Sequence, residues 1–435
     1  MPSSIHKVPA RAVLLRQLAT ANRFVWLSVP GQLIAGGCLA SLIDWHLVEA
    51  DPLLPTIALA FMVGPIGLGI MQSWAKKKKE IGDLREDTHF GQYDKYRLQT
   101  LFQDTLQKLN LPDEKLPVYI TADKFLNAGA MHLGFGGFFK SLNGVYLNRQ
   151  VLHKLEPEEV QDIMGHELGH YYKHYLLGDR LRAITTALGA ILGIYVSQVV
   201  GMSSFISIIA LSGCTTVFWS ASNFQRIRHG QTIEYLCDDL GAQVHGVEAS
   251  INGLMKLGAD SELQQAVLQQ AMQSRHYEGL SPAEIMQAVQ TAVPYGHVSR
   301  DELEQAVERS LKKQATQSQG ISLSGFARHF WNSDLEEEAK EEFDEELRKI
   351  ARIRSASRLN WESILNDPER LHLSEPQIGQ LVDMIESQPT HLLFHIPDEA
   401  GSLDGVHPPL KLRILYLWKN RDEIENARSE SNSGW

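Results

Sequence analysis

Long uncharged apolar segments are the feature that most constrains the fold of this 435-residue chain. Residues 24–43 and 53–74 contain no charged side chain, and each is long enough to cross a hydrocarbon core, which takes about 20 apolar residues. Residues 183–225 are also uncharged and contain a break at Gly201, which predicts two further spans joined by a tight turn. A helical hairpin buried against protein is the alternative for this second pair. The segments together predict about four transmembrane helices.

The charges of the connecting segments predict an orientation. Residues 1–23 carry four basic side chains and no acidic one, residues 44–52 carry three acidic side chains and no lysine or arginine, and four lysines stand at 76–79. Basic loops remain on the cytoplasmic side of a membrane. We therefore expect the N-terminus and the region after the second span to be cytoplasmic.

Composition excludes some classes of protein. The net charge of -11 argues against a nucleic-acid binder, which would need a concentrated basic face. The three cysteines, Cys38, Cys214 and Cys237, are too few for a disulfide framework and favour a reducing compartment. Cys237 stands close to a candidate metal ligand, but we expect it to be a small packing residue and not a zinc ligand.

A His-Glu-x-x-His pattern at residues 166–170 predicts a metal site. His166 and His170 lie four positions apart, so on a helix both imidazoles share one face and can meet a single zinc ion. Glu167 points slightly off that face and can act as a general base toward a water. Pro157 and the acidic residues after it suit the first turn of such a helix. The small residues at 165 and 169 would let another backbone approach closely.

A catalytic zinc needs a third protein ligand and an open fourth position. His174 is tempting, but it lies too far along the helix axis to complete a tetrahedron. Glu234 and Asp238, after the uncharged region, are also four positions apart, so both carboxylates face one way. One of them can bind the metal while the other accepts a histidine N–H.

Short strands are predicted at residues 116–121 and 143–147, and helices at 76–109 and after 260. Residues 125–131 fit an exposed edge strand to which an extended peptide could add, or equally a turn-rich meander. The predicted fold class is mainly α with a small β-sheet (α+β). It combines about four transmembrane helices with a zincin-type HExxH domain on the cytoplasmic side.

Residues 166–170, the membrane hairpin and residues 234–238 together resemble the M48 peptidases, which include the HtpX heat-shock proteases and the Ste24 CaaX prenyl proteases. The four-span layout is closest to HtpX. The resemblance implies one Zn²⁺ per chain and the following assignments: His166, His170 and Glu234 as metal ligands, Glu167 as catalytic base, His407 as the group that steadies the oxyanion, Asp238 and Arg413 as their supporting residues, and Asn127 and Ala128 as substrate-binding residues.

The patterns and the resemblance together predict seven segments. These are 1–80 with two transmembrane helices, 81–182 with the edge strand and HExxH helix, 183–225 as a transmembrane hairpin, 226–259 with the third ligand, 260–395 as a helical insertion, 396–424 with a His-Pro…Arg element, and 425–435 as a disordered tail. The expected function is zinc-dependent hydrolysis of misfolded or surplus membrane proteins at a bacterial inner membrane, as quality control. A CaaX-type processing protease and a non-catalytic scaffold with a relic metal site are the alternatives. The expected partners are these substrates and the lipid bilayer, without nucleic acid.

Overall fold

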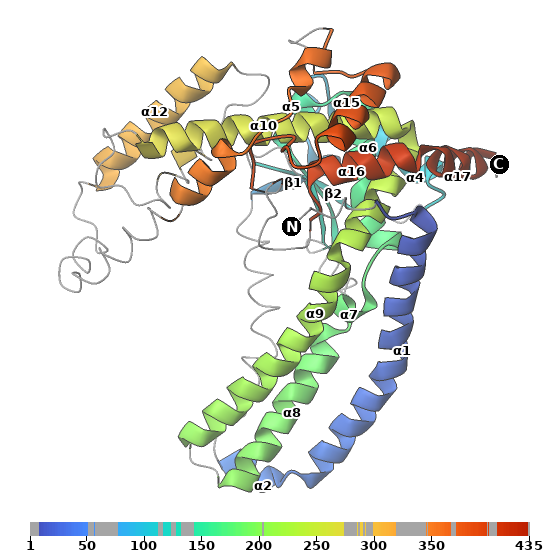
Figure 1. Ribbon diagram of the computed structural model, residues 1–435. Coiled ribbons are helices and arrows are strands. Elements are labelled where there is room, and N and C mark those ends of the chain that lie inside the picture. Colours follow the sequence, from blue (N-terminus) through green and yellow to red (C-terminus); the bar gives the residue numbers. More distant parts are fainter. Residues whose placement is uncertain are drawn as a thin grey trace.

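The computed structural model describes residues 8–50, 77–111, 116–122, 128–131, 143–201, 204–273, 299–318, 347–366, 371–397 and 407–433, with a few isolated positions. Its described part is mostly helical with one small mixed sheet, which confirms the α+β expectation. Figure 1 shows a body of helices and strands at one end of three long helices. These are α1 (Arg11–Leu42), α8 (Arg182–Val200) and α9 (Ser204–His245).

Two of the described helices, α1 and α8, are long and apolar enough to cross a membrane. About four spans were expected: residues 53–74, apart from Thr56, lie outside the described residues, and residues 205–222 lie in the first half of α9. Nearly all exposed large apolar side chains of the described chain lie on α1, α2 (Trp45–Ala50), α8 and α9. Phe205 and Val217 on α9 are 72% and 64% exposed, which is contrary to a hairpin buried against protein.

Helices α8 and α9 pack closely because small residues line their contact. A Cβ atom added at Gly193 would lie 2.6 Å from Leu211 Cα, and one at Gly189 would lie 2.8 Å from Phe218 Cβ. The hydroxyls of Ser197 and Ser207 are 2.6 Å apart across the same contact. Gly201, with φ of 100°, ends α8 in the left-handed region that favours glycine.

The sheet has the order β1-β2-β4-β3, from β1 (Lys78–Glu80), β2 (Val118–Thr121), β3 (Ala128–Met131) and β4 (Gly144–Asn148). Strands β2 and β4 are parallel, whereas both outer pairs are antiparallel. The two predicted strands are thus confirmed, and β3 confirms the edge strand at Ala128, while Asn127 lies outside the described residues.

The helix expected over residues 76–109 was wrong at its start. Residues 78–80 form strand β1, a 3-10 turn η1 (Ile81–Asp83) follows, and only α4 (Lys95–Lys108) is helical. The sequence of β1 is charged and gives no strand signal. The strand is stabilised by its pairing with β2 and by Lys78, whose Nζ lies 5.2 Å from the centre of the Tyr119 ring.

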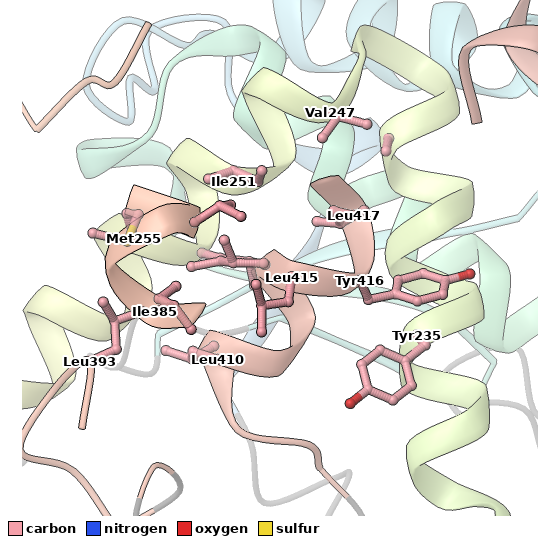
Figure 2. Packing of buried hydrophobic residues seen from close by; sticks show 14 of the residues in the cluster. Tyr235, Val247, Ile251, Met255, Ile385, Leu393, Leu410, Leu415, Tyr416 and Leu417 are labelled. Atoms are coloured by element: carbon pink, nitrogen blue, oxygen red, sulfur yellow. The ribbon is translucent and has the colours of Figure 1, made fainter. Parts of the chain in front are cut away.

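Two apolar cores flank the metal-binding region. One joins the sheet, α4 and α6 (Pro157–Leu168). The other joins α9 to α10 (Val247–Gln273), η5 (Trp361–Ile364), α15 (Glu375–Ser387) and α16 (Leu410–Lys419), and Figure 2 shows its side chains meeting around α16. Residues from the proposed 260–395 insertion therefore contribute to the same core as α9 and α16.

The end of the chain is helical, so the expected disordered tail was wrong over most of its length. Helix α17 (Arg421–Ser433) continues after α16. Its polar composition suggested disorder, but Ile424 is fully buried and fixes the helix against the core. Other helices of the described part are α5 (Arg149–Lys154), α7 (Leu177–Arg180) and α12 (Arg300–Ser318), and residues 347–355 are helical as well.

Candidate metal centre

Helix α6 presents the first histidine of the HExxH pattern. Pro157 occupies its first turn, and Glu156 and Glu159 form a capping box that satisfies the free backbone amides there. The α-helix ends at Leu168 and continues as a π-helical turn, η3 (Gly169–Lys173), in which His174 N–H donates to Gly169 O at 2.7 Å. His170 therefore projects from a widened turn, a feature often found at functional sites.

Two glycines bring α9 against this turn. A Cβ atom at Gly169 would lie 2.9 Å from Cys237 Sγ and 3.2 Å from Cys237 Cα. At Gly165 it would lie 3.0 Å from Gly241 Cα. The close approach expected from the sequence is confirmed, and it explains why the fully buried residue at 237 is small.

Three side chains converge where α9 meets η3. His166 Nε2 lies 3.2 Å from His170 Nε2 and 3.7 Å from Glu234 Oε2, and His170 Nε2 lies 3.5 Å from Glu234 Oε1. Tetrahedral ligands about 2.0–2.1 Å from a zinc ion stand about 3.4 Å from one another. The three donors therefore fit a metal ion, and within the described chain they form the one such group of histidine, cysteine or acidic side chains. His174 and Cys237 are not members of it.

Asp238 fixes the orientation of His166. Its Oδ1 lies 2.9 Å from His166 Nδ1, so that nitrogen carries the proton and Nε2 faces the ligand group. Arg413, from α16, donates to both oxygens of Asp238, with Nε at 2.7 Å from Oδ2. Burial opposes the charge on Asp238, but the Arg413 and His166 contacts outweigh burial and lower the pKa of its carboxyl.

The two histidines differ in basicity. Burial lowers the pKa of His166, yet the hydrogen bond and charge of Asp238 raise it to about 9. Burial and the neighbouring His166 lower the pKa of His170 to about 4. His170 is therefore neutral at pH 7, the state in which imidazole can bind a metal.

Glu167 lies between the ligand group and the edge strand. It is only 7% exposed, and burial raises the pKa of its carboxyl to about 7. The backbone N–H of Ala130 in β3 donates to it. The expected base thus contacts the strand along which a substrate backbone was expected to lie.

His407, just before α16, lies on the open side of the ligand group. Its Nδ1 is 3.2 Å from Glu234 Oε2, and its side chain is 52% exposed. The structure brings this late histidine to the site, as the sequence resemblance implied.

A cleft of about 820 Å³ contains the group. Strand β3 lines one side through Ala128, Gly129 and Ala130. Helix α10 lines another through Leu254 and Leu257. The cleft can therefore hold an extended chain beside β3 and within reach of Glu167.

One buried carboxylate beneath the site was not predicted. Asp162 accepts a hydrogen bond from Ser250, and burial raises the pKa of its carboxyl to about 7. It lies four positions before His166, so the helical period could have placed it on the ligand face. Nothing in the sequence pointed to Ser250, which comes from α10.

Two histidines, one carboxylate and an adjacent buried glutamate in a cleft are the groups that metal-dependent hydrolases use. The profile of peptidase family M48 matches residues 93–324, from α4 past α12, including the edge strand and the three converging donors. The chain belongs to peptidase family M48. It matches no curated protein and no solved structure.

Proposed function

We propose that the protein is a membrane-bound, zinc-dependent endopeptidase of unfolded or surplus membrane proteins. The observation that supports this most is the convergence of His166, His170 and Glu234, with Glu167 buried beside them, in a member of a peptidase family. The donor set is that of catalytic zinc sites, in which three protein ligands leave one position open.

His166, His170 and Glu234 would hold the zinc ion, which supplies Lewis acidity and a water whose pKa is near 7. Glu167 accepts the proton of the attacking water and later delivers it to the leaving amine. Asp238 keeps the Nδ1 proton of His166 in place, and Arg413 holds Asp238.

His407 supports the transition state in this proposal. Its exposed ring lies beside Glu234 in the cleft, where it can donate to the oxygen that becomes negative as the peptide bond is attacked. Loss of one such donor typically lowers kcat about 100-fold or more.

Strand β3 supports recognition of the substrate backbone. An extended segment that adds to a sheet edge is held by main-chain hydrogen bonds, so its side chains matter little. Asn127 and Ala128 keep their expected role in this binding. Such recognition suits unfolded chains, and the exposed apolar side chains of α1, α8 and α9 favour substrates in the same bilayer.

The wider role follows from resemblance to the HtpX proteases. It is quality control at a bacterial inner membrane, with the N-terminus and the active site in the cytoplasm. A CaaX-type processing protease would share the zinc site and requires a prenylated substrate.

The test is Glu167→Gln in the full chain, purified in detergent and assayed for zinc content and for cleavage of an unfolded membrane protein by mass spectrometry. The variant should keep one zinc ion per chain and lose cleavage, because the amide cannot accept the proton. The control is Glu158→Gln, the same change at an exposed position on the same helix, which should leave both readings unchanged. Undiminished cleavage by Glu167→Gln would rule out the proposed base.

A further inference from the structure

Three helices change from apolar to charged at the same level. Arg23 on α1, Arg182 at the start of α8 and Arg226 on α9 mark this change. Helices α1 and α8 run in the same direction. Thr185 donates a hydrogen bond to Gln32, and the Asp44 N–H donates one to Gln198, so each residue of α8 lies level with the residue of α1 about 153 to 154 positions before it. Arg182 therefore lies within about 8 Å of Arg23 along the helix axes.

The antiparallel contact of α8 and α9 extends this level to the third helix. Gly189 faces Phe218, so Arg182, seven positions earlier, lies level with about residue 225 of α9. Ile227 is the last exposed large apolar side chain on α9. The charges thus mark one edge of the membrane-facing part of the molecule.

Helix α9 continues without interruption from this edge to the metal ligand. Glu234 follows Arg226 by eight positions, and an α-helix rises 1.5 Å per residue, so the ligand group lies about 12 Å beyond the edge. Figure 1 shows the same order: α7 and the middle of α9 lie between α8 and the body of the molecule.

The cleft connects this edge to the metal centre. Asp179 on α7 and Arg226 and Gly230 on α9, which lie near this edge, line the cleft. His166, Glu234 and Gln264 on α10 line the same cleft. A chain that leaves the bilayer beside α9 can therefore enter the cleft directly and reach Glu167.

We propose that the enzyme cuts extended juxtamembrane segments and that its structure sets a minimum distance between the bilayer and the scissile bond. An extended chain rises about 3.3 Å per residue, so about four residues span the 12 Å between the edge and the metal centre. Peptide bonds nearer to the apolar span stay out of reach of Glu167. This inference rests on the proposed endopeptidase function and defines its substrate class more narrowly.

The test uses the full-length enzyme in lipid vesicles with single-span substrates that carry one apolar span and the same unstructured tail. Products are mapped by mass spectrometry. The first cut should fall about four residues beyond the span. Insertion of three inert residues between span and tail should move the first cut three residues toward the span within the tail sequence. The inference would be overturned if the two peptide bonds next to the span were cut as readily as the bonds farther out. It would also be overturned if the cut stayed at the same tail sequence after the insertion.

A soluble peptide with the same tail separates this inference from the proposed function. Cleavage of the soluble tail together with distance-independent cuts in the vesicles overturns the minimum distance alone. Failure to cleave either substrate by zinc-loaded protein overturns the endopeptidase function and the minimum distance with it. Glu167→Gln supplies the background for both substrates.

Discussion

Replacement of Asp238 by asparagine tests how the site holds its metal. The carboxylate of Asp238 accepts hydrogen bonds from His166 and from two nitrogens of Arg413. An asparagine has almost the same shape, but its NH₂ group must face one of these donors. His166 then loses its fixed orientation, or Arg413 stays buried without a full partner.

The expected effects differ for metal binding and folding. Loss of a carboxylate that orients a ligand histidine weakens metal affinity about 10- to 100-fold. Removal of one partner from a buried ion pair costs about 3–5 kcal/mol of folding stability. We expect a loss of stability at the lower end of this range, because the charges of Glu234 and Asp162 still act on Arg413. Zinc affinity is measured by competition with a chromophoric chelator at pH 7, and stability by chemical unfolding without zinc.

Asp239→Asn is the matched control. Asp239 is equally buried on the same helix, but it pairs with Arg11 and Gln243 and not with a histidine. Burial raises the pKa of its carboxyl despite the charge of Arg11. The control should leave zinc affinity unchanged. Equal zinc affinity in Asp238→Asn and Asp239→Asn would refute the role given to Asp238.

Three further predictions concern stability and activity. Glu399 is buried and accepts the Lys411 N–H at the start of α16, and burial raises the pKa of its carboxyl to about 6 from 4.5. The raised pKa means that protonated Glu399 stabilises the folded state by about 2 kcal/mol relative to the ionised form. This stabilisation is complete below pH 4.5 and is lost as pH rises through 6. The free energy of unfolding of Glu399→Gln should therefore vary less with pH between 4.5 and 6 than that of the parent protein. Gly258→Ala should lower stability by about 1–3 kcal/mol with zinc affinity unchanged, because the new Cβ would overlap the buried Phe394 ring; unchanged unfolding contradicts this. His407→Ala should lower kcat about 100-fold while zinc stays bound, whereas a change in KM alone would count against an oxyanion role.

The metal site could largely be predicted because each half is local in the sequence. His166 and His170, and likewise Glu234 and Asp238, are four positions apart, so the helical period alone places each pair on one face. The π-helical turn at η3 could not be predicted, since no local sequence pattern marks it; in the structure Gly169, its first residue, lies close against Cys237 of α9.

Features that depend on contacts between distant segments could not be predicted from local sequence patterns either. Strand β1 exists because β2 pairs with it, and α17 is ordered because Ile424 is buried in a core built from other helices. The partners of Asp162 and Asp239 come from α10 and α1, which no local period connects to α6 or α9.

The unbroken course of α9 has a mechanical consequence. One rigid rod is anchored among the apolar helices at one end and carries Glu234 about 12 Å past their edge. A tilt of the rod by about 5° would displace that carboxylate by about 1 Å, and misplacement on this scale can slow catalysis on the order of 100-fold. If the proposed membrane location is correct, a bilayer whose thickness makes α9 tilt would change the reaction rate.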